Sequence, residues 1–224
     1  MSKIEKKHDE LENVEHVLTT SEAFIEKYQK QILYVVGGIV LVVIIVLAFR
    51  NFYLKPQEIE AENEMFKAQT FFNVDSFKIA LDGKANEFIG FKEIVSEYGI
   101  TASGNLAAAY TGICYYKLGQ YVNAIKYLSQ FDGEDEYFTT SVIGLTGDCH
   151  IELGDKKKAI SFFEKAADKN NEVLSPIYLK KAGLTYESLN QPEKALKLYN
   201  KIKDDYSKSA EASDIDKYIA RIQK

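Results

Sequence analysis

Cysteine and histidine are scarce in this chain, which has two cysteines and three histidines among 224 residues. The cysteines, Cys114 and Cys149, form no CxxC motif and are too few for a disulfide scaffold, so they leave the redox compartment open. An HExxH motif, a glycine-rich phosphate loop and closely paired carboxylates are also missing. We therefore expect a protein that is not an enzyme and that uses no cofactor or metal.

Positive charge is not in excess either. The chain has 28 lysine and arginine residues against 33 aspartate and glutamate residues, a net charge of −5. Proteins that bind nucleic acid use basic residues to neutralise phosphates, so the charge balance gives no support for a nucleic-acid partner. No motif indicates a small-molecule substrate, and none is expected.

One stretch lacks charge altogether. Residues 32–49 read ILYVVGGIVLVVIIVLAF, eighteen residues without Asp, Glu, Lys or Arg. At ~1.5 Å per residue, this run and its flanks match a hydrocarbon core of ~30 Å, so we predict a transmembrane helix over residues 32–50. The 31 residues before it are too long and acidic for the start of a cleavable signal peptide, and no Ala-x-Ala site follows. We interpret the span as an uncleaved signal anchor.

Lysine is slightly more frequent before the span than after it. The two flanks supply, on the N-terminal side, Lys3, Lys6, Lys7, Lys27 and Lys30 and, on the C-terminal side, Arg50, Lys55 and Lys67. Because positive residues favour the cytoplasmic side, residues 1–31 are predicted to be cytoplasmic and residues 51–224 to lie across the membrane. Charge alone leaves the orientation open.

Strand-like alternation is missing after the span, and the chain is predicted to be all-α. Lys55-Pro56 is expected to mark the exit from the membrane, since proline disfavours helix in the residue before it. Pro176 and Pro192 are expected in the first turns of later helices, Pro176 behind a capping Ser175.

A set of small and aromatic residues recurs every 35 or 36 residues. The three copies are Gly112, Tyr115, Gly119, Ala124, Leu128 and Phe131; Gly147, His150, Gly154, Ala159, Phe163 and Ala166; and Gly183, Tyr186, Asn190, Ala195, Tyr199 and Ile202. An internal repeat of this length indicates an α-solenoid built from helical hairpins. Gly90, which lies 34 residues before Ala124, marks a degenerate fourth copy.

Each conserved-spacing position of the repeat, called a slot below, has a role in helix packing. The first glycine is predicted to remove a side chain where the two helices of a hairpin cross, and the alanine to let the second helix approach. The second glycine, replaced by Asn190 in the third copy, is predicted to end the first helix in a left-handed conformation. The predicted divisions are a tail at 1–31, the span at 32–50, a helical part with the degenerate repeat at 51–104, three repeats at 105–207 and a capping helix at 208–224.

The pattern resembles the tetratricopeptide repeat. The resemblance covers about residues 105–207 and is carried by YYKLGQYVNAIKYL, HIELGDKKKAISFFEKA and YESLNQPEKALKLYNKI. The chain departs from that repeat because it lacks the usual tryptophan and places His150 in a tyrosine slot. A packed core histidine is favoured over a base or a ligand, and both cysteines are expected to be buried, reduced thiols.

The whole layout resembles the YfgM-like family, single-span membrane proteins with a C-terminal tetratricopeptide domain. The stretch GFKEIVSEYGITASGNLAAAYTGICYYKLGQY is similar to Bacteroidetes members of that group. The resemblance implies an inner-membrane protein with a periplasmic repeat domain, associated with the SecYEG translocon, a PpiD-like chaperone and exported clients. It implies no catalytic residues.

The first helix of each hairpin is expected to line a concave, mostly apolar groove. Its predicted residues are Leu106, Ala109, Ile113, Tyr116, Ser141, Gly144, Asp148, Ile151, Ile177, Lys180, Leu184 and Glu187. Tyr116, Ile151 and Leu184 recur along one face and are the strongest candidates for contact with a partner. The alternative for each residue is packing against a neighbouring helix.

Three functions compete at this stage. The first is a membrane-anchored periplasmic scaffold, ancillary to the Sec translocon and to periplasmic chaperones. The second is a structural subunit of another cell-envelope assembly, and the third is a repeat receptor that faces the cytosol. The third is weakened because Lys180 is the sole basic residue on the predicted inner helix face, too few for binding an acidic tail.

Overall fold

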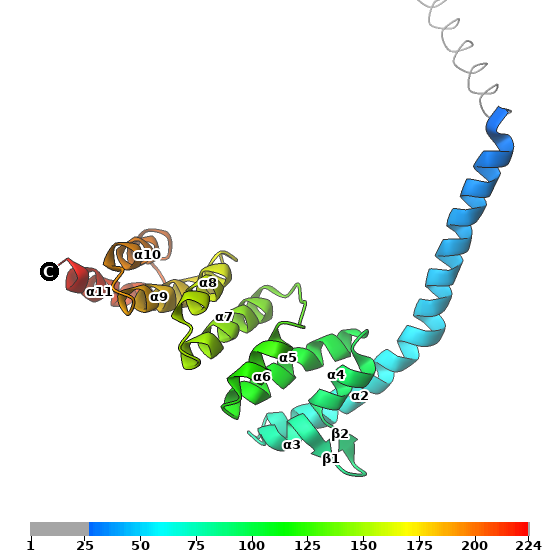
Figure 1. Ribbon diagram of the computed structural model, residues 1–224, viewed down its shortest axis with the longest axis horizontal. Helices are drawn as coiled ribbons and strands as arrows, with labels where there is room; N and C mark the ends of the chain where they lie inside the picture. The colour runs from blue at the N-terminus through cyan, green and yellow to red at the C-terminus, as the bar shows by residue number, and fades with distance from the viewer. Residues whose placement is uncertain (1–26, 224) are drawn as a thin grey trace, which may run out of the picture. The chain divides into compact units, whose positions relative to one another are not determined.

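A computed structural model of the chain describes residues 27–223 (Figure 1). The chain divides into two compact units, residues 1–55 and residues 56–224. The predictions about residues 1–26, which form most of the N-terminal tail, lie outside the described residues.

The first unit contains the apolar segment. A helix that begins at Lys27 includes all of residues 32–49, and by length and composition it is able to cross a membrane. Its large side chains are exposed along the whole run, from Ile32 to Phe49. Among residues 27–223, no other segment covers this apolar surface, as expected of a helix that faces lipid.

The helix does not end at Lys55-Pro56, although proline disfavours helix in the residue before it. It continues to Phe72, first as a π-helical turn, η1 (Arg50–Leu54), and then as α2 (Lys55–Phe72). The backbone N–H of Lys55 donates to the carbonyl of Arg50, five residues back. A π-turn of this kind rearranges the backbone bonds next to Pro56, which has no N–H to donate.

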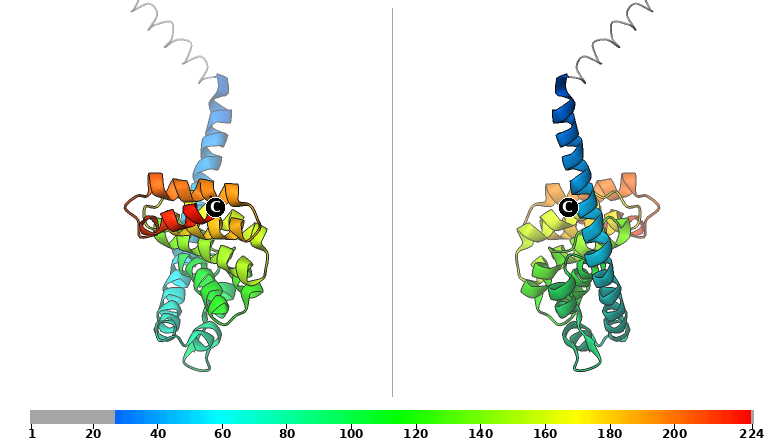
Figure 2. Two further views of the ribbon diagram at one scale, coloured as in Figure 1. Left: turned by 90° about the vertical axis from the view of Figure 1, so that its left-hand side faces the viewer. Right: turned by 90° about the vertical axis from the view of Figure 1, so that its right-hand side faces the viewer.

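The second unit consists of α2 from Pro56 onward and the helices that follow. These are α3 (Phe77–Asp82), α4 (Phe91–Tyr98), α5 (Ala102–Lys117), α6 (Tyr121–Leu128), α7 (Glu136–Glu152), α8 (Lys156–Ala167), α9 (Leu174–Glu187), α10 (Pro192–Asp205), the 3₁₀ turn η2 (Glu211–Ser213) and α11 (Ile215–Ile222). The helices α5 to α10 form three successive hairpins that pack one on the next, from green to orange in Figure 2. The predicted helical solenoid is confirmed.

The small residues lie where the repeat pattern places them. A Cβ added to Gly183 would lie 2.3 Å from the ring of Tyr199, and one added to Gly147 would lie 2.6 Å from the ring of Phe163. Ala124, Ala159 and Ala195 are fully buried. The first helices end at left-handed residues, Gly119 (φ 72°), Gly154 (φ 77°) and Asn190 (φ 55°).

The segment of the degenerate repeat departs from the regular hairpins. Its first helix, α3, has only six residues, and a small antiparallel hairpin joins it to α4. This hairpin pairs β1 (Gly83–Lys84) with β2 (Phe88–Ile89), in the register Gly83↔Ile89 and Lys84↔Phe88. This small hairpin was not predicted, because two-residue strands are too short to show any alternation in sequence, and it leaves the all-α fold class unchanged.

Helix α9 begins earlier than predicted. Its capping side chain is Asn171, whose Oδ1 accepts from the N–H of Val173 (2.9 Å) and of Leu174 (2.8 Å). Ser175 instead donates from Oγ to the carbonyl of Ala167 (2.7 Å). Pro192 starts α10 as predicted.

Candidate partner-binding surface

Helices α5, α7 and α9 are the first helices of the three hairpins and carry the predicted groove residues. The structure buries one of these residues completely. Ala109 has no exposed surface and belongs to a core cluster with Ala124, Leu128 and Val142. Its placement on a partner-binding face is corrected, since the small side chain serves close packing between helices.

Gly144 is also covered. A Cβ on Gly144 would overlap the ring of Tyr178, which comes from α9. Leu106 and Ile113 are half-buried and pack against core clusters. For these three positions, packing against a neighbouring helix accounts for the residue type.

Tyr116 is half-buried and has a partner within its own hairpin. Its ring meets that of Tyr121 edge to face, with ring centroids 5.7 Å apart. Burial, and after it the negative charges of Asp148 and Glu152, raise the pKa of Tyr116. Tyr116 therefore faces an acidic edge of α7 rather than open solvent.

Ile151 and Leu184 are the predicted contacts that remain available. Their exposed fractions are 38% and 39%, which is high for aliphatic side chains on a folded domain. They lie on α7 and α9, whose helices are adjacent in the stack. A partner with an apolar side chain gains free energy by covering them.

Both lysines near this face already have carboxylate partners. Lys181 Nζ donates to Asp148 Oδ1 (2.8 Å) and Oδ2 (2.7 Å), which joins α9 to α7. Lys180 Nζ donates to Asp214 Oδ1 (2.6 Å) and lies 4.6 Å from the centre of the Tyr218 ring. Neither ammonium group is free for an acidic tail.

The end of the repeat array is closed by α11. Glu187 accepts from Tyr199 Oη (2.6 Å) and from Arg221 Nη2 (2.7 Å), and Ile215 is buried in the same cluster as Tyr199. Helix α11 therefore covers the predicted groove residues Lys180 and Glu187 on α9. Its spacing of apolar residues, Ile215, Tyr218, Ile219 and Ile222, was the sequence signal for this packing.

Ile177 lies at another opening, near the start of α9. It lines a hollow of about 560 Å³ together with Val173 and the segment from Asp205 to Glu211. Val173 is largely exposed there. This places Ile177 apart from the Ile151 and Leu184 pair, at the edge formed by the turn after α10.

His150, Cys114 and Cys149 are packed in the core. His150 is 7% exposed and stacks on Phe162, with centroids 5.3 Å apart, and burial lowers the pKa of its imidazole. Cys114 and Cys149 are free and buried, and burial raises the pKa of each thiol to about 12. Within residues 27–223, no cluster of metal-binding side chains occurs.

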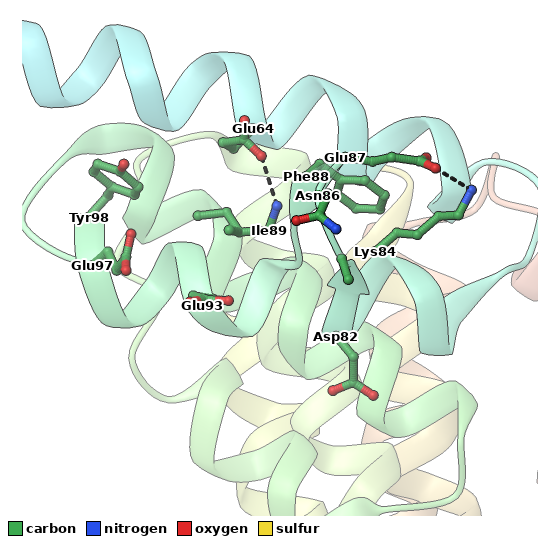
Figure 3. A pocket seen from close by; sticks show the side chains of 11 residues that line it. Glu64, Asp82, Lys84, Asn86, Glu87, Phe88, Ile89, Glu93, Glu97 and Tyr98 are labelled. Carbon is green, nitrogen blue, oxygen red and sulfur yellow. Dashed lines mark hydrogen bonds and ion pairs between the residues drawn. The ribbon is translucent and has the colours of Figure 1, made fainter.

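A second surface, which sequence reasoning missed, lies between α2, the β1–β2 hairpin and α4. A hollow of about 550 Å³ lies there. Figure 3 shows side chains that line it, among them Glu64 on α2 and Glu93, Glu97 and Tyr98 on α4. Glu64 Oε2 accepts from the N–H of Ile89 (2.9 Å), which fixes the hairpin against α2. No spacing in the sequence brings these residues together, because they come from separate elements.

Family comparison places tetratricopeptide repeats in the C-terminal region. One tetratricopeptide-repeat profile matches residues 110–132 and 181–209, and a second matches residues 143–168. Among curated proteins, no sequence matches this chain.

Solved structures support the fold. A crystal structure of Podosopora anserina kinesin light chain-type, nearly identical TPR-like repeats is 12% identical, with a TM-score of 0.53 over 72% of this chain and 84% of that one. A related structure of the same repeats is 11% identical, with a TM-score of 0.52 over 76% and 86%. The C-terminal region therefore has a tetratricopeptide-like solenoid fold.

Proposed function

We propose that this protein is a membrane-anchored scaffold that binds other proteins through the exposed apolar pair Ile151 and Leu184. Residues 32–50 anchor it, residues 1–31 lie in the cytoplasm and the repeat domain lies in the periplasm. In this proposal it acts beside the Sec translocon and a PpiD-like chaperone, where exported clients emerge.

The observation that carries this proposal is the combination of exposed apolar side chains with paired charges on the first helices. Tetratricopeptide repeats are protein-interaction modules. Ile151 and Leu184 are exposed, while Lys180 and Lys181 are held by Asp214 and Asp148. Such a face favours an extended or partly folded apolar segment over an acidic tail.

A membrane tether strengthens such binding without further contacts. It raises the effective concentration of the repeat face near any partner in the same membrane. Weak apolar contacts then suffice to hold a client briefly, which suits a scaffold beside an export channel.

Site-specific photocrosslinking during export tests the proposal. A crosslinking amino acid at Ile151 or Leu184 is expected to capture newly exported proteins, whereas one at Lys197, exposed on α10, is expected to capture none. The double variant Ile151→Glu with Leu184→Glu is expected to remove capture and to keep its helical content. Equal capture at all three positions would contradict the assignment of this face.

Two alternatives give different results in the same cells. A structural subunit of another envelope assembly would crosslink to fixed partners, with no dependence on ongoing export. A receptor that faces the cytosol would be shielded from protease in spheroplasts, whereas a periplasmic repeat domain is digested there.

A further inference from the structure

The net charge of this chain is confined to one segment. Residues 56–100 contain nine acidic side chains and four lysines, which accounts for the whole net charge of −5. Residues 101–224 contain seventeen residues of each sign, and residues 1–55 contain seven of each. The negative potential therefore gathers on the part of the domain formed by α2, α3, the hairpin and α4.

Part of this charge has a structural role. Glu58 accepts from the N–H of Ala102 (2.7 Å) and of Ser103 (2.9 Å) at the start of α5. Glu64, Asp82 and Glu87 form ion pairs with lysines. In the part of the chain that the structure describes, Glu93 and Glu97 form no ion pair.

Large apolar side chains are exposed in the same segment. Phe66 on α2 is 73% exposed and lines a hollow of about 480 Å³ with Glu60, Asn63, Glu64, Lys67 and Tyr98; Lys67 is paired with Glu64. Ile59, seven residues earlier on the same helix face, is 61% exposed. Glu64 and Tyr98 also line the hollow of Figure 3, so the two hollows adjoin.

We propose that this α2–α4 surface, made of Ile59, Phe66, Tyr98, Glu60, Glu93 and Glu97, docks a basic segment of another protein that inserts an apolar side chain beside Phe66. Exposed apolar side chains mark interaction sites when polar residues surround them. The surrounding charge selects the occupant. A cationic segment gains from five excess negative charges, and its lysine or arginine side chains reach Glu93 and Glu97.

Charge also argues against the other occupants. A second copy of this chain would bring an equal negative surface against the first, and an anionic membrane surface would be repelled in the same way. Residues 101–224, which include Ile151 and Leu184, have no net charge, so the two surfaces are expected to select different partners.

The test uses the full chain in phosphatidylcholine nanodiscs and three labelled synthetic peptides. The first alternates lysine with serine around one central phenylalanine. In the second, glutamate replaces lysine, and in the third, serine replaces phenylalanine. Fluorescence anisotropy, corrected with empty nanodiscs, is expected to show binding of the first peptide about tenfold tighter than either counterpart, with a steep loss as salt rises.

Variants locate the binding. Phe66→Ser and the pair Glu93→Gln with Glu97→Gln are each expected to weaken binding of the first peptide about fivefold or more. Matched controls are Val74→Ser, another exposed apolar residue of the segment, and Glu193→Gln with Asp204→Asn on α10; these are expected to leave binding unchanged. Equal losses in the control variants would overturn the proposal, because they would show only nonspecific attraction.

Two further measurements separate the other occupants. Sedimentation of the nanodisc-embedded chain is expected to show no Phe66-dependent self-association, and flotation with phosphatidylglycerol vesicles is expected to show no Phe66-dependent binding. Either effect, if present and lost in Phe66→Ser, would overturn the proposal in favour of a second copy or a membrane.

Discussion

The three repeat hairpins and the segment before them bury aromatic side chains by different means. In the repeats, each large residue fits over a glycine on the partner helix, as Phe163 does at Gly147 and Tyr199 does at Gly183. In residues 56–100, aromatic rings stack on one another instead, as Phe71 does on Phe88 with centroids 5.0 Å apart. The first arrangement needs a fixed spacing in the sequence, and the second does not.

The contacts that join the helices also differ between the repeats and residues 56–100. Within each repeat hairpin, a short turn that contains a left-handed glycine or asparagine joins the two helices. The earlier segment is held by long-range bonds from α2, such as those from Glu58 to α5 and from Glu64 to the hairpin. Local rules therefore shape the repeats, whereas contacts distant in sequence shape the segment before them.

The largest expected effect tests whether the two cores are equally important for stability. Phe163 and Phe91 are both buried, the first in the repeats and the second in the earlier segment. Phe163→Ala and Phe91→Ala are each expected to cost ~3–5 kcal/mol of unfolding free energy, through lost burial and a cavity. Thermal unfolding followed by circular dichroism measures this for the full chain in detergent.

The form of the transition sharpens the comparison. Phe91 stacks on Tyr110 of α5, with centroids 5.1 Å apart, so damage to the earlier segment is expected to reach the repeats. Both variants should lower one shared transition. A separate early transition in Phe91→Ala alone would show that residues 56–100 unfold as an independent unit.

This difference explains what the sequence could predict. The slots at Gly112, Gly147 and Gly183 and the left-handed ends of the first helices were predictable, because each depends on residues close in the chain. The continuation of the helix through Pro56 was not predictable, since proline disfavours helix in the residue before it. The structure instead accommodates Pro56 with the π-helical turn Arg50–Leu54. The β1–β2 hairpin was missed because two-residue strands leave no periodic pattern.

The candidate surface was predictable only in part. Helical periodicity placed Ile151 and Leu184 on one face, and the structure leaves both exposed. The same periodicity placed Ala109 and Lys180 there, but a neighbouring helix buries the first and Asp214 of the capping segment engages the second. A projection of one helix does not include its neighbours, so it cannot distinguish a groove from a buried interface.

An intermediate effect is expected at the bond that joins the two regions. Glu58 on α2 accepts from the first N–H groups of α5 and from Ser103 Oγ (2.6 Å). Glu58→Ala should cost ~0.5–2 kcal/mol, the range for losing a helix cap, because those donors lose their partner. Glu62→Ala, an exposed position one turn later, is the control and should change little.

Chemical unfolding with urea measures both variants. If Glu58→Ala and Glu62→Ala have the same midpoint, α2 does not contribute to α5 through this cap. The repeats would then not depend on the earlier segment at this contact. That result would contradict the inference that long-range hydrogen bonds from α2 hold the two regions together.

The smallest expected effect concerns the one repeat slot that departs from the pattern. Tyr115 and Tyr186 fill this slot in the first and third copies, whereas the second copy has His150, buried against Phe162. Burial lowers the pKa of His150 below its ordinary value of 6.5. The unfolded chain therefore takes up a proton at pH values where the folded chain does not, and stability falls as pH decreases from 6.5 toward the folded pKa.

His150→Tyr removes this titration, so the wild type should lose more stability than the variant between about pH 7 and pH 5.5, above the range where carboxylates titrate. Urea midpoints across that range measure the difference. Parallel curves for the two proteins would mean that His150 titrates alike in both states, and that its slot is open to water rather than packed as in the neighbouring repeats.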